Sequence, residues 1–295
     1  MPVQTANTLF RFTAELPHLL AIISNGFHPR LSRERFLNIE DIYLPMICFC
    51  DIPLSMVDDH MFKYGKYGVG MTKEWGIAKG LNPVLYYNEE SILIQSFFKL
   101  IFDGHIKTQE LYRLAANGEW VGDGGSKSLI VDHKAEGYKE KRDAYWQVID
   151  RLGALSGLKC YFKPRVGEYV IGGKHYPNYH FYDEREWRYV EREYDFESRN
   201  KPPKIEEVNL HGEHLSQEEK QQYNAKIEAE GKYKLDFSAS DVKYIIVKSD
   251  EEIIPLVKYL QLLPSHTNNG LRFTPEEISL LTSRILTSDQ IKEDF

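Results

Sequence analysis

The seven residues 184–190, Glu-Arg-Glu-Trp-Arg-Tyr-Val, constrain the fold more than any other stretch of this chain. The pattern is typical of one short strand, in which successive side chains point to opposite faces. Glu184, Glu186 and Arg188 then share one face, and the indole of Trp187 lies on the other. Because unpaired charges are costly to bury, the charged face must be solvated, ion-paired or part of a site.

Two interpretations of this charged face are open. A pair of carboxylates suits glycosyl-transferring chemistry, because carboxylates can hold sugar hydroxyls and stabilise an oxocarbenium-like transition state. The alternative is a solvated edge strand carrying Glu–Arg pairs, since clustered carboxylates mark function in only some proteins. The spacing alone does not decide between them.

Composition limits the classes of partner. The chain has 295 residues, of which 42% are hydrophobic and 13% aromatic, enough for a sizeable core. A net charge of −7 argues against a broad footprint on duplex DNA or an anionic membrane. No apolar run approaches the roughly 18 residues of a membrane span, and the N-terminus lacks a basic segment followed by an apolar core. We therefore expect a cytoplasmic protein with no membrane partner.

The cysteines do not predict a metal site. Cys48 and Cys50 flank Phe49, and with His60 or Cys160 they would be potential zinc ligands. Their spacing differs from the common zinc knuckle, and alternation places both thiols on one strand face, where cysteine packs as a small hydrophobe. No signature ties a histidine to a cysteine nucleophile either. We expect no metal.

Hydrophobic periodicity predicts an α+β fold with a mixed, mainly antiparallel sheet and flanking helices. The expected strands are 9–13, 43–49, 66–72, 81–87, 159–166, 178–190 and 244–247, separated by helices of unequal length. The predicted organisation is a single domain over 1–265, with a polar insertion at about 191–231. A helical C-terminal tail over 266–295 follows, in which Thr274 and Pro275 open a capping box.

Several local signals refine this outline. The helix that begins at Leu16 is expected to end at Gly26. Gly68 and Gly70 interrupt a predicted strand, which indicates a bulge or the close approach of another backbone. The glycine-rich stretch 117–137 is expected to form a long loop or lid.

Seven motifs follow one another along the chain: FRFT (10–13), LLAIISNGFHPR (19–30), ICFCDIPLS (47–55), YGKYGVGMTKEWG (64–76), NPVLYY (82–87), EREWRYV (184–190) and KYIIVKS (243–249). This ordered set resembles the AbiGi family of abortive phage-resistance proteins. The resemblance implies an antitoxin role, in a two-gene abortive-infection operon whose second gene encodes a toxin.

Three features occur in a fixed order along the predicted strands: a polar residue between aromatics on the first strand, an aromatic motif on a middle strand and a Glu-x-Glu on a late strand. This order more distantly resembles that of the ADP-ribosyltransferases. The resemblance implies an ADP-ribosyltransferase-like fold with NAD as substrate. Arg11 would contact the nicotinamide ribose or the phosphates, and Thr13 would support it.

The same resemblance assigns the remaining site residues. Phe49, or Tyr64 and Tyr67, would stack on nicotinamide, although aromatic side chains on a strand are more often core residues. Glu186 would be catalytic and hold the ribose 2′-hydroxyl, while Glu184 would position the acceptor. The Ser-Thr-Ser motif of the arginine-first class does not occur in this chain.

The sequence thus leaves two functions open. One is an NAD-dependent mono-ADP-ribosyltransferase that acts on a nucleic acid or protein during phage infection. It predicts a cleft in which both glutamates meet Arg11, with Tyr64 and Tyr67 at its border. The other is a non-catalytic antitoxin or regulatory partner of an adjacent toxin, for which the acidic stretch 191–207 is the expected docking surface.

Overall fold

The computed structural model describes residues 6–36, 40–115, 117–121, 128–134, 136–171, 174–190, 215–231, 233–264 and 271–294. The predicted docking stretch 191–207 lies outside these ranges, and of the polar insertion the structure describes 215–231. That part contains a helix over Gln217–Glu230 that begins with a Ser216 capping box.

The strands are β1 (Thr8–Thr13), β2 (Arg30–Phe36), β3 (Glu40–Cys50), β4 (Tyr67–Thr72), β5 (Asn82–Pro83), β6 (Leu85–Tyr87), β7 (Glu119–Val121), β8 (Ser128–Ile130), β9 (Phe162–Pro164), β10 (Val166–Ile171), β11 (Lys174–His180), β12 (Glu186–Val190), β13 (Val242–Val247) and β14 (Ile285–Thr287). The α-helices are α1 (Leu16–Asn25), α2 (Asp58–Tyr64), α3 (Lys73–Ala78), α4 (Ile92–Ala115), α5 (Tyr138–Ser156), α6 (Gln217–Glu230), α7 (Ile253–Leu262), α8 (Pro275–Thr282) and α9 (Ser288–Asp294).

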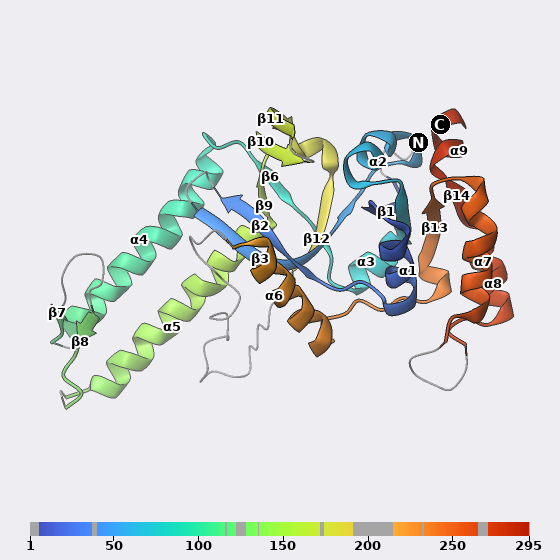
Figure 1. Ribbon diagram of the computed structural model, residues 1–295. Helices are drawn as coiled ribbons and strands as arrows, with labels where there is room; N and C mark the ends of the chain where they lie inside the picture. The colour runs from blue at the N-terminus through green and yellow to red at the C-terminus, as the bar shows by residue number, and fades with distance from the viewer. Residues whose placement is uncertain are drawn as a thin grey trace. The chain divides into compact units, whose positions relative to one another are not determined.

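One large sheet organises the fold (Figure 1). Its strand order is β14-β13-β4-β1-β3-β12-β5, and β2 pairs with β3 off this path. The neighbours pair antiparallel except β13 and β14, which are parallel. The predicted α+β class with a mixed, mainly antiparallel sheet is therefore confirmed.

Both faces of this sheet are covered by helices. On one face, Leu9, Phe49 and Val69 belong to a core cluster that also takes buried residues from α1, α3, α7 and α8. On the other face, Phe10 and Cys50 pack with residues of α2 and α9. Burial of both faces explains why the central strands are rich in apolar residues.

The glycines of β4 allow β1 to approach closely. A Cβ at Gly68 would lie 2.9 Å from the Phe12 ring, and one at Gly70 would lie 2.9 Å from the side chains of Phe10 and Thr8. The space at these glycines is therefore filled mainly by side chains of β1, rather than by another backbone as predicted. The predicted end of α1 is confirmed, since its C-cap Gly26 has φ 82°, a left-handed value that suits glycine.

By its contacts the chain divides into two compact units. The first contains 1–86, 163–194 and 205–295, and the second contains 87–162 and 195–204. The predicted domain 1–265 therefore spans parts of both.

The tail predicted over 266–295 is not purely helical, because β14 adds a parallel strand to the main sheet. In the stretch 117–137, predicted as a loop, β7 and β8 pair as a hairpin. Among the described helices, none is both long and apolar enough to cross a membrane.

Candidate functional site

The Glu-x-Glu segment folds differently from a single strand. Glu186 lies opposite Cys50 of β3 and Arg188 opposite Cys48, so these two charged side chains share a face of the sheet as predicted. Glu184 instead ends a 3-10 turn over Phe181–Glu184. Between the glutamates, Arg185 adopts φ 45° and ψ 51°, a left-handed conformation that is unusual for a residue other than glycine.

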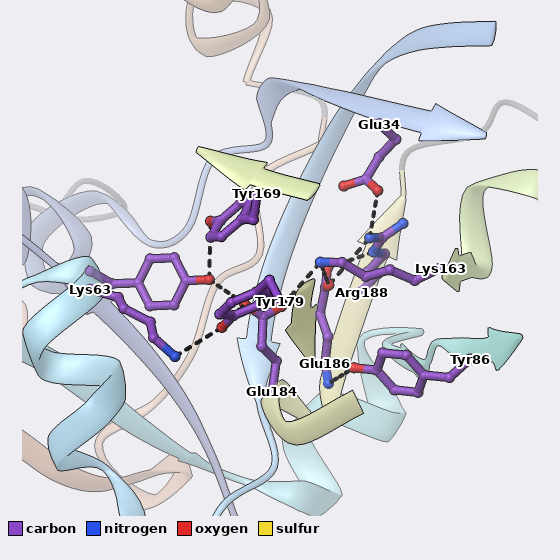
Figure 2. A network of polar contacts seen from close by, with 10 residues as sticks. Glu34, Lys63, Tyr86, Lys163, Tyr169, Tyr179, Glu184, Glu186 and Arg188 are labelled. Carbon is purple, nitrogen blue, oxygen red and sulfur yellow. Dashed lines mark hydrogen bonds and ion pairs between the residues drawn. The ribbon is translucent and has the colours of Figure 1, made fainter. Parts of the chain in front are cut away.

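This break in alternation brings both glutamates to one ammonium group. Lys163 of β9 donates from Nζ to Glu186 Oε2 at 2.5 Å and to Glu184 Oε2 at 3.1 Å (Figure 2). The side chain of Lys163 is 12% exposed, and those of both glutamates are 7% exposed. The interpretation of this face as solvated is therefore wrong, because its charged groups are buried and paired.

Arg188 forms the other half of the network. The Arg188 Nε donates to Glu186 Oε1 at 2.5 Å, and the Arg188 Nη2 lies 3.0 Å from Glu34 Oε2 of β2. The Arg188 side chain is fully buried. The Glu186 backbone N–H also donates to the Tyr86 hydroxyl at 2.8 Å. Both carboxylate oxygens of Glu186 are thus used by cationic donors, the arrangement that makes a buried charge tolerable.

Two tyrosine hydroxyls donate hydrogen bonds to the other glutamate, Glu184. The hydroxyls of Tyr64, from α2, and Tyr179, from β11, donate to Glu184 Oε1 at 2.6 and 2.9 Å. The hydroxyls of Tyr64 and Tyr169 lie 3.3 Å apart, and Lys63 Nζ donates to the Tyr179 hydroxyl at 3.0 Å (Figure 2). The network therefore joins α2, the β10–β11 hairpin and the main sheet.

The pKa shifts follow from these pairs. Burial raises the pKa of Glu186, but Arg188 and Lys163 outweigh it and hold the pKa well below its usual value. Burial lowers the pKa of Lys163, yet Glu186, Glu184 and Glu34 raise it well above its usual value. Burial and Glu184 raise the pKa of Tyr64. At neutral pH Glu186 and Lys163 are therefore charged and Tyr64 keeps its proton.

Arg11 lies on the other side of the sheet from Glu186. Phe10 of β1 is opposite Cys50, and Cys50 is opposite Glu186, so these three share one face. Arg11, the next residue, is on the opposite face. Its guanidinium donates to the backbone carbonyl of Cys48 at 2.9 Å, and burial lowers its pKa. The predicted cleft shared by Arg11 and both glutamates is therefore wrong.

The other predicted NAD-binding residues are also divided between the two faces of the sheet. Thr13 alternates with Arg11 and shares its face, where Phe49 belongs to the core cluster. Tyr67 belongs to the same cluster, and its hydroxyl donates to Glu252 at 2.8 Å. Of the predicted aromatic residues, Tyr64 alone contacts the glutamates in the described network.

The cysteines of β3 behave as core groups. Burial, followed by the charge of Glu186, raises the pKa of the Cys48 thiol well above its usual value. Burial and Glu184 also raise the pKa of Cys50. Both thiols therefore stay protonated, which disfavours metal ligation and nucleophilic attack. In the part of the chain that the structure describes, no three His, Cys, Asp or Glu residues are grouped to hold a metal ion.

Sequence reasoning missed Lys163, Tyr169, Tyr179 and Glu34. Lys163 stands in a predicted strand, but nothing in its local pattern relates it to residues 184–186. Two glutamates are tolerated in the protein interior only beside a cation, so a buried Glu-x-Glu indicates that a lysine or arginine from elsewhere in the chain lies next to it.

The fold and the network define an α+β protein in which buried ion pairs stabilise the contacts between the main sheet and its neighbouring elements. A family model described as "Putative abortive phage resistance protein AbiGi, antitoxin" matches residues 30–248, and the chain belongs to this family. The abortive phage resistance protein AbiGi of Lactococcus lactis subsp. cremoris is 29% identical over 274 residues, which cover 90% of this chain and 94% of that protein. The predicted AbiGi resemblance is confirmed. No solved structure matches the chain significantly.

Proposed function

We propose that this chain is a non-catalytic antitoxin of an abortive-infection system, which acts by binding a toxin encoded beside it. The family description supports the antitoxin role. The observation that carries the non-catalytic part is the state of Glu186, whose two carboxylate oxygens are bound by Arg188 and Lys163 inside the protein.

A catalytic carboxylate has to reach its substrate. Holding a ribose hydroxyl would require Glu186 to exchange an ammonium and a guanidinium partner for a neutral one. Removing one partner of a buried pair costs about 3–5 kcal/mol, because the other charge is left uncompensated. A structural role needs no such exchange. In that role the ion pairs and hydrogen bonds of the network hold β9 and β12 against β2 and α2.

Co-expression with the product of the adjacent gene tests the antitoxin role. We expect the chain to restore growth to cells that express the toxin, and to co-purify with it. If acidic side chains drive the encounter, capture should weaken as salt is raised. Deletion of residues 191–207 tests the acidic docking stretch, with deletion of the 14 residues of α6 as control. Growth that is not restored, or the absence of any complex at low salt, would contradict the proposal.

A second candidate is an NAD-dependent mono-ADP-ribosyltransferase acting on a nucleic acid or protein. It is supported by the convergence of Glu184 and Glu186 within hydrogen-bond reach of one ammonium group. Tyr64 beside Glu184 adds an aromatic ring that could stack on nicotinamide. In this proposal a substrate displaces Lys163, Glu186 holds the ribose and Glu184 positions the acceptor.

Nicotinamide release from NAD by the purified chain tests this second candidate. Glu186→Gln should then lower release by about two orders of magnitude or more, the usual scale for one well-placed electrostatic group, while NAD affinity changes little. Tyr67→Phe, remote from the network, serves as a control. No release by the wild-type chain with any acceptor, or equal release by wild type and Glu186→Gln, removes this candidate.

A further inference from the structure

The second compact unit contains a helical hairpin. Helices α4 and α5 run antiparallel, and β7 and β8 lie at the end of the pair where α4 finishes and α5 begins (Figure 1). A Cβ at Gly104 would lie 2.9 Å from Leu152, and the rings of Tyr112 and Tyr145 stack at 4.4 Å. These contacts define the line along which the two helices meet.

Apolar side chains remain exposed on both helices. On α4, Leu93 is 54%, Leu100 54% and Leu111 67% exposed. At about 100° per residue their spacings of 7 and 11 place them in one row. On α5, Val148 and Leu155 are 40% and 36% exposed and, seven residues apart, also form a row.

The two rows lie on the same side of the hairpin. Leu100 comes four residues before Gly104, and Val148 comes four residues before Leu152. Each row is therefore rotated in the same sense, and by a similar angle, from the residue at the contact line. In an antiparallel pair of right-handed helices, equal rotations fall on the same side. We call this surface, made of Leu93, Leu100, Leu111, Val148 and Leu155, the leucine side.

Charge indicates what covers the leucine side. Residues 87–162 contain 10 Lys and Arg against 11 Asp and Glu, a formal charge of −1, whereas the whole chain carries −7. Most of the negative charge thus lies outside the hairpin. Two copies of this acidic chain repel each other least when they meet through their nearly neutral hairpins.

The flank of the hairpin that carries the leucine side is large enough for such a contact. The 19 residues of α5 span about 28 Å, and two packed helices are about 20 Å wide, which gives roughly 560 Å² in projection. Accessible area exceeds projected area because the surface is corrugated. It is therefore comparable with the roughly 800 Å² that each partner contributes to a stable interface.

We propose that the leucine side binds the leucine side of a second copy of this chain, so that two hairpins form a four-helix bundle. The bundle gives each helix a second apolar contact, which a lone two-helix hairpin does not provide. This inference does not depend on the proposed function, because it concerns the chain alone.

Sedimentation velocity and light scattering on the full-length chain test the proposal, at concentrations from about 1 to 100 μM. We expect a species of about twice the 34.4 kDa chain mass that dissociates on dilution. The double variant Leu100→Glu with Leu111→Glu should weaken self-association at least about 100-fold, because it places charges at the apolar contact. Ile106→Glu is the matched control. Ile106 is 53% exposed on the same helix, but it comes two residues after Gly104, about 200° around the helix, and so faces away from α5 rather than along the leucine side.

The outcomes separate the alternatives. A wild-type chain that stays monomeric at about 100 μM overturns the proposal, and so does an Ile106→Glu variant that dissociates as readily as the double variant. A monomeric chain that binds the toxin through the leucine side also overturns it, while leaving the antitoxin function in place. If the double variant loses helical circular dichroism, Val148→Ser with Leu100→Ser replaces it, and the same shift to monomer is expected.

Discussion

Lys163→Met tests the buried network at its centre. The substitution removes the ammonium group that Glu184 and Glu186 share and replaces it with an apolar side chain of similar length. Arg188 then remains as the cation that faces Glu186 and Glu34. We expect a large loss of stability, because like charges in a buried site are left uncompensated.

The magnitude follows from the charge balance. In the native network three carboxylates face an ammonium and a guanidinium, so the formal charge is −1, and the substitution makes it −2. Breaking a buried pair by removing one partner costs about 3–5 kcal/mol. Glu186 keeps Arg188 and Glu184 keeps its tyrosine hydroxyls, so we expect the lower end, about 3 kcal/mol.

Urea unfolding and amide hydrogen exchange measure this loss. At a typical slope of roughly 2–3 kcal/mol per molar urea, the unfolding midpoint of the first unit should fall by about 1–1.5 M. Exchange of the β12 amides reports that unit separately from the α4–α5 hairpin. Lys63→Met is the matched control. It removes an ammonium that donates to the Tyr179 hydroxyl rather than to a carboxylate, and should cost about 1 kcal/mol or less. A Lys163→Met variant no less stable than Lys63→Met would refute the reasoning.

Three further predictions concern the same region. Because the pKa of Glu186 is held below its usual value, the Glu186 carboxylate stabilises the fold above about pH 4.3, the pKa of a glutamate in the unfolded chain, and this stabilisation is lost as the pH falls further. The free energy of unfolding, measured as a function of pH, should show this loss in the wild-type chain and a smaller one in Lys163→Met. Tyr64→Phe should cost about 1.5–3 kcal/mol in urea unfolding, since it removes a hydrogen bond to charged Glu184, and a cost under about 0.5 kcal/mol would contradict that bond. Arg185→Gly should raise the thermal midpoint or leave it unchanged, because glycine accepts the left-handed backbone at this position, whereas a marked destabilisation would show that the Arg185 side chain is needed.

Features that depend on near neighbours in the chain could be predicted from the amino-acid sequence. The end of α1 follows from the conformational freedom of Gly26, and the close packing of β1 on β4 follows from Gly68 and Gly70. The shared face of Glu186 and Arg188 follows from strand alternation. The mainly antiparallel sheet also follows from the short apolar runs and the irregular helices between them.

The partners of those charged side chains could not be predicted in this way, because they depend on how distant segments pack. Strand register places Arg11 across the sheet from Glu186, and a change of one residue in register would reverse that result. The left-handed backbone at Arg185 turns Glu184 toward Lys163, although the local pattern predicted a continuous strand. Lys163 itself comes from 21 residues earlier in the chain, and burial makes its meeting with the two carboxylates obligatory. Ion pairs between distant segments carry no sequence period, so they emerge only when the whole sheet has formed.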